Sequence, residues 1–244
     1  MDSPLITIEQ CDSYLIIRLN RPEKSNALTQ EMILALSHIF TKLDTEPNIR
    51  AVILTGTGNE AFCAGTDVPE LAGPNESELF ARGQDLFHQI DSCRVPVIAA
   101  VNGIAAGEGC ELALACHLRI ASANARFSLP EARSGIVRGY ESTLELLTGK
   151  EVPAKEALRS GLVNHVVPAA RLLAQAEALA REIAQLAPLA IRACLEAVNQ
   201  GIQLPLAEAL ALETKLFASL FDTDDVREGT SAFLEKRSPV FKGT

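Results

Sequence analysis

The sequence predicts an α/β fold with a helical C-terminal region. Up to about residue 165, apolar segments with strand character alternate with amphipathic helical segments, which is typical of stacked β/α units. From Ala169 onward only helical patterns remain. Because no low-complexity linker divides the chain, we expect one folding unit, made of a β/α core over residues 1–168 and a helical region over residues 169–244.

The spacing of apolar residues predicts the elements of the core in order. The chain opens with a hairpin of LITIEQ and YLIIRLN, with its turn at Cys11-Asp12-Ser13. A helix follows, because Met32, Leu36, Ile39, Phe40 and Leu43 recur at spacings of three and four, and Thr29 is its expected N-cap. The remaining core elements are the buried strands AVILTGTG and VPVIAAVNG, the amphipathic helix SELFARGQDLFHQID between them, and the short strands LRIAS and ARFSL.

The helical region carries apolar stripes along its whole length. Helices are expected over residues 172–187, 188–200, 205–221 and 223–236. One stripe contains Leu206, Leu210, Phe217, Leu220 and Phe221. The region is apolar enough in places to favour docking on a neighbouring subunit.

Composition argues against several classes of function. A net charge of −9 disfavours binding of nucleic acid or of an anionic membrane by general electrostatics, although a few local bases can hold one small polyanionic ligand. No apolar run reaches the length of a membrane span, and the N-terminus lacks the features of a signal peptide, so we expect a cytoplasmic protein. The six cysteines include no CxxC pair and the four histidines no HxxxH or HExxH, which favours buried reduced thiols and no metal site.

Two glycine-containing loops follow the two buried strands. They are FCAGTDVPEL (62–71) and GIAAGEGCEL (103–112), and each leads toward a helix start, where backbone N–H groups point outward. Side by side, such loops can aim two N–H donors at one oxygen and form an oxyanion hole. The alternative is that the glycines only permit tight turns.

Two glutamates in separate elements are candidates for proton transfer. Glu111 lies in the second glycine loop, and Glu131 follows Pro130 at the exit of a short strand. Two carboxylates that meet in one pocket can divide the roles of acid and base. Spacing alone leaves open the reading that both are ordinary surface charges.

An ordered series of motifs resembles one family across nearly the whole chain. NRPEKSNAL, AFCAGTD, VPVIAAVNGIAAGEGCELALACHLRIAS, ARFSLPE, GLVNHVVP and AFLEKRSPVFKG are similar to the crotonase (enoyl-CoA hydratase/isomerase) superfamily. The resemblance implies a ClpP/crotonase-like spiral of repeated β-β-α units and acyl-CoA thioester substrates. It also implies homotrimers, often paired into hexamers, and no cofactor beyond the CoA of the substrate.

The resemblance also implies the site residues. The backbone N–H groups of Thr66 and Glu108 match the oxyanion-hole donors, Glu111 matches the base, Glu131 the acid, and Gly139 a glycine that helps to position the water. The residues that match the CoA-binding segments are Lys24, Ser25, Ala27, Leu28, Ala64, Thr66, Asp67, Val68, Phe233 and Lys236, the last two commonly reaching CoA from a neighbouring subunit.

The presence of both glutamates favours an enoyl-CoA hydratase, because simple double-bond isomerases of this family need only one carboxylate. The alternative is an enoyl-CoA isomerase or another reaction through an acyl-CoA enolate. A second alternative is a non-catalytic member that binds CoA or RNA, against which the acidic balance of the chain weighs.

Three features depart from the family pattern. Glu108 stands where glycine is usual, and we expect its side chain to turn away from the carbonyl site, toward solvent or a subunit interface. His117 stands where aspartate is usual, which we interpret as a matter of packing. The helix usually found between Ser142 and Leu144 is missing, either from the protein itself or only from the sequence as assembled.

Overall fold

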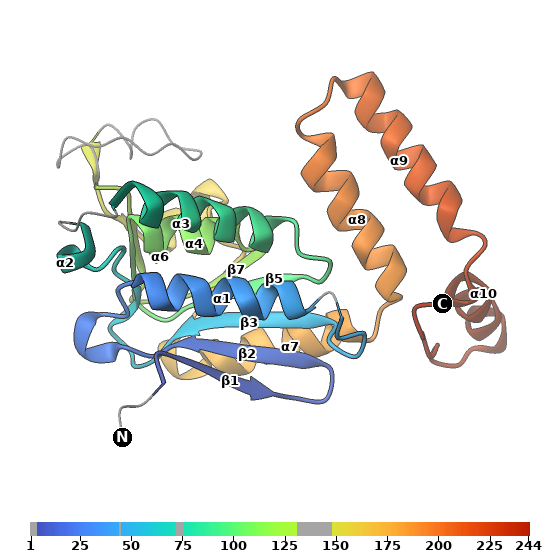
Figure 1. Ribbon diagram of the computed structural model, residues 1–244. Helices are drawn as coiled ribbons and strands as arrows, with labels where there is room; N and C mark the ends of the chain where they lie inside the picture. The colour runs from blue at the N-terminus through green and yellow to red at the C-terminus, as the bar shows by residue number, and fades with distance from the viewer. Residues whose placement is uncertain (1–3, 44, 72–75, 131–147) are drawn as a thin grey trace.

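The strands of the core form two β-sheets, and the strands of residues 51–128 alternate between the two. Figure 1 shows the larger sheet with its helices. The computed structural model describes residues 4–43, 45–71, 76–130 and 148–244. Within these residues, the larger sheet has the order β1 (Ile6–Gln10), β2 (Tyr14–Leu19), β3 (Ala51–Gly56), β5 (Val97–Val101), β7 (Leu118–Ser122) and β10 (His165–Val167). The smaller sheet has the order β4 (Ala61–Cys63), β6 (Ile104–Ala106), β8 (Arg126–Ser128) and β9 (Val152–Pro153).

The strand pairing confirms the predicted repeats. The consecutive pairs β3–β4, β5–β6 and β7–β8 each place one strand in the larger sheet and the next in the smaller sheet. Within each sheet these strands pair in parallel, whereas β1 with β2 and β8 with β9 pair antiparallel. The result is the expected spiral of β-β-α units.

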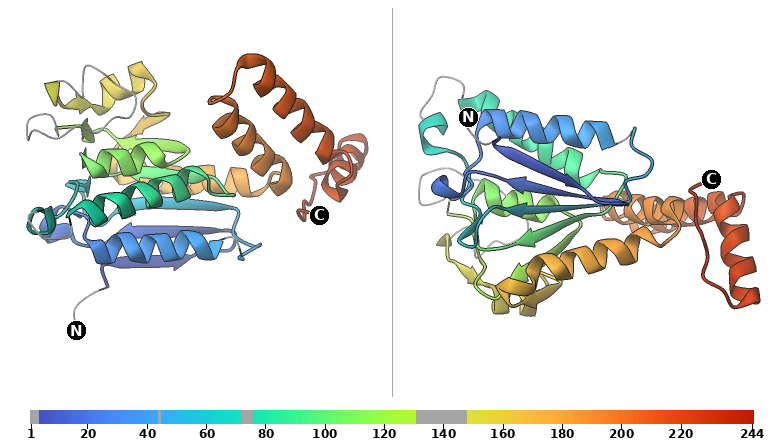
Figure 2. Two further views of the ribbon diagram at one scale, coloured as in Figure 1. Left: turned by 45° about the horizontal axis from the view of Figure 1, so that its top comes forward. Right: turned by 90° about the horizontal axis from the view of Figure 1, so that it is seen from below.

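Helices cover both faces of the larger sheet (Figure 2). One face packs against α1 (Gln30–Leu43), α3 (Glu76–Asp91) and α4 (Glu108–Ala115), and the other against α7 (Leu172–Ala184). All residues of β3 and β5 are buried, as expected for parallel strands covered on both sides. The shorter elements are the 3-10 turns Pro22–Lys24 and Ala169–Arg171 and the helices α2 (Val68–Leu71) and α6 (Ala154–Ser160).

Local hydrogen bonds confirm the predicted ends of the first elements. In the hairpin turn the Cys11 N–H donates to the Tyr14 carbonyl at 2.9 Å. The Thr29 hydroxyl accepts from the Met32 N–H at 3.2 Å, as an N-cap does. The C-terminal helices also lie where the apolar spacing predicts them, as α7, α8 (Pro188–Gly201), α9 (Leu206–Leu220) and α10 (Asp224–Glu235).

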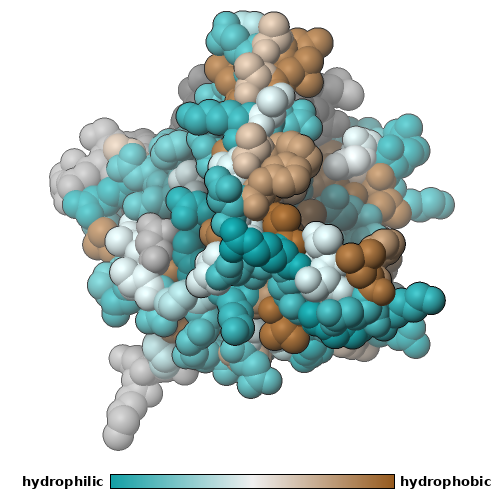
Figure 3. Space-filling model, turned by 90° about the vertical axis from the view of Figure 1, so that its right-hand side faces the viewer, coloured by the Kyte–Doolittle hydropathy of each residue, from teal (hydrophilic) through white to brown (hydrophobic). Residues whose placement is uncertain are grey.

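The hairpin of α8 and α9 stands beside the core and leaves apolar side chains uncovered (Figures 1 and 3). Val198, Ile202 and Leu206 are 66%, 84% and 75% exposed, and Phe217 and Phe221 on α9 are more than half exposed. No helix in the described part of the chain is long and apolar enough to cross a membrane.

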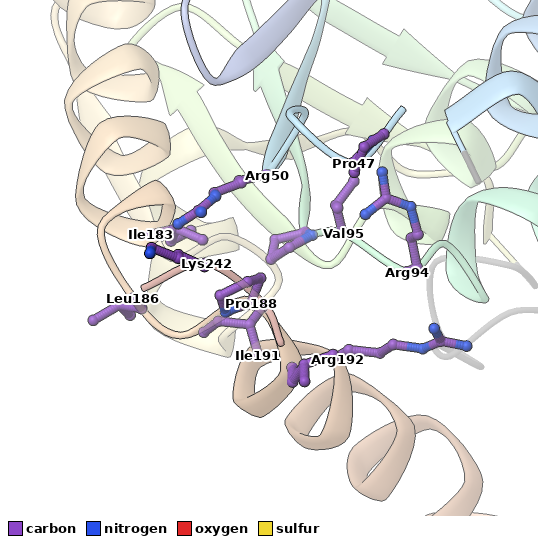
Figure 4. Close-up of a pocket in the computed structure, with 13 residues that line it drawn as sticks. Pro47, Arg50, Arg94, Val95, Ile183, Leu186, Pro188, Ile191, Arg192 and Lys242 are labelled. Carbon is purple, nitrogen blue, oxygen red and sulfur yellow. The ribbon is translucent and has the colours of Figure 1, made fainter. Parts of the chain in front are cut away.

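Arg50 joins the C-terminal region to the core, and Arg94 lies beside it and bonds within the core (Figure 4). The Arg50 guanidinium donates to the carbonyls of Ala184 at 3.0 Å and Phe241 at 2.7 Å. Arg94 donates to the carbonyl of Leu43 at the end of α1. Both line a pocket between the core and the C-terminal region, together with Arg192 and Lys242. These four cations therefore lie at this boundary and not at the glycine loops.

His117 fills a structural position behind the second glycine loop. Its Nδ1 accepts from the Val97 N–H at 3.0 Å, and its Nε2 lies 3.1 Å from the Asp91 carbonyl. The neutral tautomer with the proton on Nε2 satisfies both contacts. His117 therefore ties the end of α3 to the start of β5, in agreement with a packing role.

The burial of His117 predicts a pH dependence of stability. Burial lowers the pKa of His117 below its usual 6.5, although the Asp91 carbonyl opposes the shift. The unfolded chain therefore binds a proton that the folded chain does not, and the free energy of unfolding should fall as the pH decreases below about 6.5. His117→Gln, which can donate and accept at similar positions, should flatten this slope in urea titrations between pH 7.5 and 5. An unchanged slope in the variant would contradict the assignment.

Candidate active site

The two glycine loops lie side by side at one edge of the smaller sheet. β4 and β6 are parallel neighbours, so the loops that follow them leave at the same edge. Gly65 has a φ of 103°, and a Cβ at this position would lie 3.0 Å from the Ala106 carbonyl oxygen and 3.7 Å from the Glu108 nitrogen. Only glycine therefore allows both this backbone conformation and this approach.

The hydrogen bonds of Leu28 set the direction of the Thr66 peptide. The Leu28 N–H donates to the Gly65 carbonyl, and the Leu28 carbonyl accepts from the Asp67 N–H, both at 2.8 Å. In this parallel pattern the N–H of the intervening Thr66 points away from Leu28. Glu108 begins α4, so its N–H points out of the N-terminal end of that helix. Two N–H donors from different loops thus lie at one junction, an arrangement able to stabilise negative charge on an oxygen.

The expected turn of the Glu108 side chain toward solvent or a subunit interface is wrong. Glu108 is only 2% exposed, and its carboxylate is hydrogen-bonded to the Thr66 hydroxyl. Its Oε1 also lies 2.8 Å from the position that a Cβ on Gly83 of α3 would occupy. The side chain therefore stays inside the protein, because the packing of α3 on α4 closes the way to solvent and Thr66 supplies a polar contact.

Glu111 lies one helical turn after Glu108 on α4 and is 6% exposed. It contributes to a pocket between α3 and α4 that is lined by Gln84, Phe87, His88, Asp91, Glu111, Leu114 and Ala115. A buried carboxylate that opens onto a pocket can transfer a proton to or from a bound molecule. Glu131 and Gly139 lie outside the described residues, so the predicted pairing of Glu111 with Glu131 stays a prediction.

The two predicted CoA-binding segments lie against each other. The Ala64 N–H donates to the Ser25 carbonyl at 3.0 Å, and Leu28 pairs with Thr66 as described above. Lys24, Ala64 and Val68 are exposed, whereas Leu28 is fully buried. Residues 24–28 and 64–68 therefore form one continuous wall beside the N–H junction.

Two residues that hold this wall escaped the sequence analysis. Arg21 pairs with the Asp67 carboxylate at 2.7 Å and donates to the Ala27 carbonyl at 2.9 Å. The buried Asn26 accepts from the Arg21 N–H and donates to the carbonyls of Thr57 and Ala61. Both belong to the motif NRPEKSNAL, but nothing in their spacing indicates which partners they meet.

Loss of the Asn26 side chain should destabilise the fold. Asn26→Ala breaks three hydrogen bonds and leaves buried backbone groups without them, at a residue whose φ is 55°. We expect the free energy of unfolding in urea to fall by about 2–3 kcal/mol. The control Asn20→Ala, which removes one bond to the Pro4 carbonyl, should cost about 1 kcal/mol or less. Equal losses would contradict the role given to Asn26.

The C-terminal candidates lie far from this wall in the same chain. α10, with the 83% exposed Phe233, is at the opposite end of the molecule from α2 (Figures 1 and 2). Lys236 follows α10 as its exposed C-cap. These two residues are therefore not brought together with the other site residues within one chain. Among the described residues no group of three or more His, Cys, Asp or Glu side chains is arranged to hold a metal ion.

Comparison with known proteins gives a consistent result over nearly the whole chain. The family model for enoyl-CoA hydratase/isomerase matches residues 9–244. The chain is 36% identical to the short-chain-enoyl-CoA hydratase of Clostridium acetobutylicum, over 95% of both chains. It is 38% identical to the 2,3-dehydroadipyl-CoA hydratase of Escherichia coli, over 99% of both chains. A crystal structure of enoyl-CoA hydratase from Bacillus anthracis superposes with a TM-score of 0.95 at 36% identity, covering 99% of this chain and all of the other.

The alignment with the E. coli relative also bears on the missing helix. It spans 258 positions against the 244 residues of this chain, so at least 14 positions of the relative have no counterpart here. A difference of this size corresponds to a helix of about four turns.

Proposed function

Because the chain belongs to the enoyl-CoA hydratase/isomerase family, we propose that it is an enoyl-CoA hydratase, which adds water across the double bond of a trans-2-enoyl-CoA. The observation that carries the proposal is the junction of the Thr66 and Glu108 peptides, with Glu111 one helical turn away. The two relatives at 36% and 38% identity are named as hydratases, which supports the same activity.

The proposed reaction uses the junction as an oxyanion hole. The N–H groups of Thr66 and Glu108 bind the thioester oxygen and stabilise the enolate that forms when water adds to C3. Glu111 takes a proton from the attacking water, and Glu131 supplies the proton that C2 receives as the enolate returns to the thioester. Gly139 helps to position the water. Water is the only reactant besides the enoyl-CoA, so we propose no further cofactor.

The CoA moiety is proposed to lie along the wall of residues 24–28 and 64–68. Lys24 is exposed beside this wall and supplies a positive charge for phosphate in an otherwise acidic protein. Phe233 and Lys236 complete the CoA site from a neighbouring copy, since they lie at the far end of their own chain.

A homotrimer, or a hexamer of two trimers, is the proposed assembly. The exposed apolar residues of α8 and α9 support it, because such a surface is typical of subunit contacts. Light scattering on purified protein should give a mass of about three or six times the 26.1 kDa of one chain. A monomer at micromolar concentration would contradict this assembly. A cytoplasmic location is supported by the six free cysteines.

The deciding experiment is a hydration assay with trans-2-enoyl-CoAs of graded chain length. Loss of the conjugated enoyl absorbance, with formation of the 3-hydroxyacyl-CoA, is the expected result. Absence of turnover at every chain length would exclude the hydratase. A parallel assay with 3-enoyl-CoAs tests the isomerase alternative, and an RNA-binding assay at physiological salt tests a non-catalytic role.

A further inference from the structure

The Glu108 side chain connects the two loops whose backbones form the N–H junction. Its carboxylate is hydrogen-bonded to the hydroxyl of Thr66, the residue that carries one of the two N–H donors. Glu108 carries the other donor on its own backbone. A single side-chain contact therefore links the two donor residues directly, in addition to the approach of Gly65 to the backbone of the second loop.

Gly83 provides the space for this carboxylate. It lies within the helix α3, where glycine is less favourable than alanine by about 1 kcal/mol. A Cβ on Gly83 would lie 2.8 Å from Glu108 Oε1, which is closer than such contacts allow. A side chain at this position would push the Glu108 carboxylate out of its place. Thr66, Glu108 and Gly83 thus form a fitted group of three residues from three elements, which we call the Glu108 contact.

The Glu108 carboxylate also has a buried neighbour in β4, the thiol of Cys63. Burial raises the pKa of the Cys63 thiol to about 12, a backbone hydrogen bond of Gly65 opposes the shift, and the charge of Glu108 acts in the raising direction. Cys63 itself is fully buried at the end of β4. The carboxylate therefore lies among β4, the first glycine loop and α3, with little room to adopt another orientation.

We propose that Glu108 is a positioning residue for the oxyanion hole, which holds the Thr66 loop against the first turn of α4 through the Thr66 hydroxyl. This inference rests on the proposed function, because it assigns the junction to a thioester oxygen. What matters in the contact is the hydrogen bond and the length of the side chain. A negative charge beside a developing oxyanion does not assist it, so the charge of Glu108 is not what the reaction uses.

The test therefore compares variants that lose the hydrogen bond with a variant that loses only the charge. Glutamine has the length of glutamate and can bond to the Thr66 hydroxyl, so Glu108→Gln should have a kcat well above that of Glu108→Ala. Glu108→Ala and Thr66→Val remove the contact and should each lower kcat by about 10- to 100-fold, because the two donors lose their alignment. Thr66→Ser keeps the hydroxyl and should have a kcat well above that of Thr66→Val. The double variant Glu108→Ala/Thr66→Val should lose no more than the larger single loss, since both remove the same contact.

A second measurement separates positioning from mere stability. An aryl-substituted enoyl-CoA thioester absorbs at longer wavelength when its carbonyl is polarised, so the red shift on binding reports the oxyanion hole without turnover. Glu108→Ala and Thr66→Val should reduce the shift, whereas Glu108→Gln and Thr66→Ser should keep it. Thr55→Val is the matched control. It removes a buried hydroxyl that bonds to the Ala100 carbonyl at 2.7 Å, and it should lower stability without changing the shift.

The outcomes distinguish this inference from the proposed function. A red shift in the unmodified protein without hydration of any enoyl-CoA would exclude the proposed hydratase activity. The variants would still test the positioning role of Glu108 through the red shift. Full shifts in Glu108→Ala and Thr66→Val, or additive losses in the double variant, would overturn the positioning role whatever the hydration assay gives. No shift in the unmodified protein would overturn the oxyanion-hole assignment and with it the positioning role, while the hydration assay would still decide the hydratase activity.

Discussion

Replacement of Glu111 by glutamine is expected to lower kcat for enoyl-CoA hydration by about 10²- to 10⁴-fold, the usual contribution of a general acid or base. Glu111 is buried on α4 and opens onto the pocket between α3 and α4, so the amide keeps the packing and loses only the ability to accept a proton. The binding of a substrate analogue and the unfolding transition should change little. Steady-state kinetics, with circular dichroism as a check of the fold, measure the effect.

Glu131→Gln serves as the companion variant. A hydratase that uses both carboxylates should lose activity with either replacement. If turnover survives Glu111→Gln and is lost in Glu131→Gln, one carboxylate suffices for the reaction. This result would favour the enoyl-CoA isomerase alternative. If Glu111→Gln keeps full hydratase activity, Glu111 is not the base.

Gly65→Ala is expected to lower kcat by about 10²- to 10³-fold, the usual effect of losing one oxyanion-hole donor. The new methyl group would lie 3.0 Å from the Ala106 carbonyl oxygen, at a backbone φ of 103° that alanine does not readily adopt. The loop has to shift, and the Thr66 N–H shifts with it. Because the donor acts mainly in the transition state, kcat and kcat/KM should fall together.

Gly161→Ala is the matched control for backbone strain. Gly161 caps α6 with a φ of 83°, and a Cβ there would meet no atom within 4 Å. The substitution should lower the free energy of unfolding by about 1 kcal/mol and leave kcat unchanged. Equal kinetic effects in the two variants would show that general strain, and not the position of Thr66, accounts for the loss.

The proposed use of backbone N–H groups explains why the site tolerates an acidic residue at position 108. The thioester oxygen is proposed to meet backbone N–H groups, so the side chain of Glu108 is free to serve another purpose as long as it turns away from the junction. Packing decides where it lies, because the Thr66 hydroxyl offers it a hydrogen bond and Gly83 of α3 leaves room for it.

The sequence by itself determined the longer helices and strands and the order of the loops, but not the short strands β4 and β6, which fall in or beside the segments read as glycine loops. The hairpin, the buried strands β3 and β5 and all four C-terminal helices lie where the apolar spacing predicts them, because spacing depends on which face of each element is buried. The Thr29 cap was predictable for a similar reason, since it depends on residues within one helical turn. The ordered motifs also identified the family, which the comparisons confirm.

Only the tertiary structure decided how residues far apart in the chain meet. The contact of Glu108 with Thr66, the pairing of Arg21 with Asp67 and the three hydrogen bonds of Asn26 join segments separated by up to 46 residues or cross between elements. The prediction that the Glu108 side chain turns toward solvent was wrong because it depends on such contacts. Side-chain direction is set by which neighbours leave room and offer a hydrogen bond, and here those neighbours are Gly83 and Thr66, on elements that local sequence does not connect to α4.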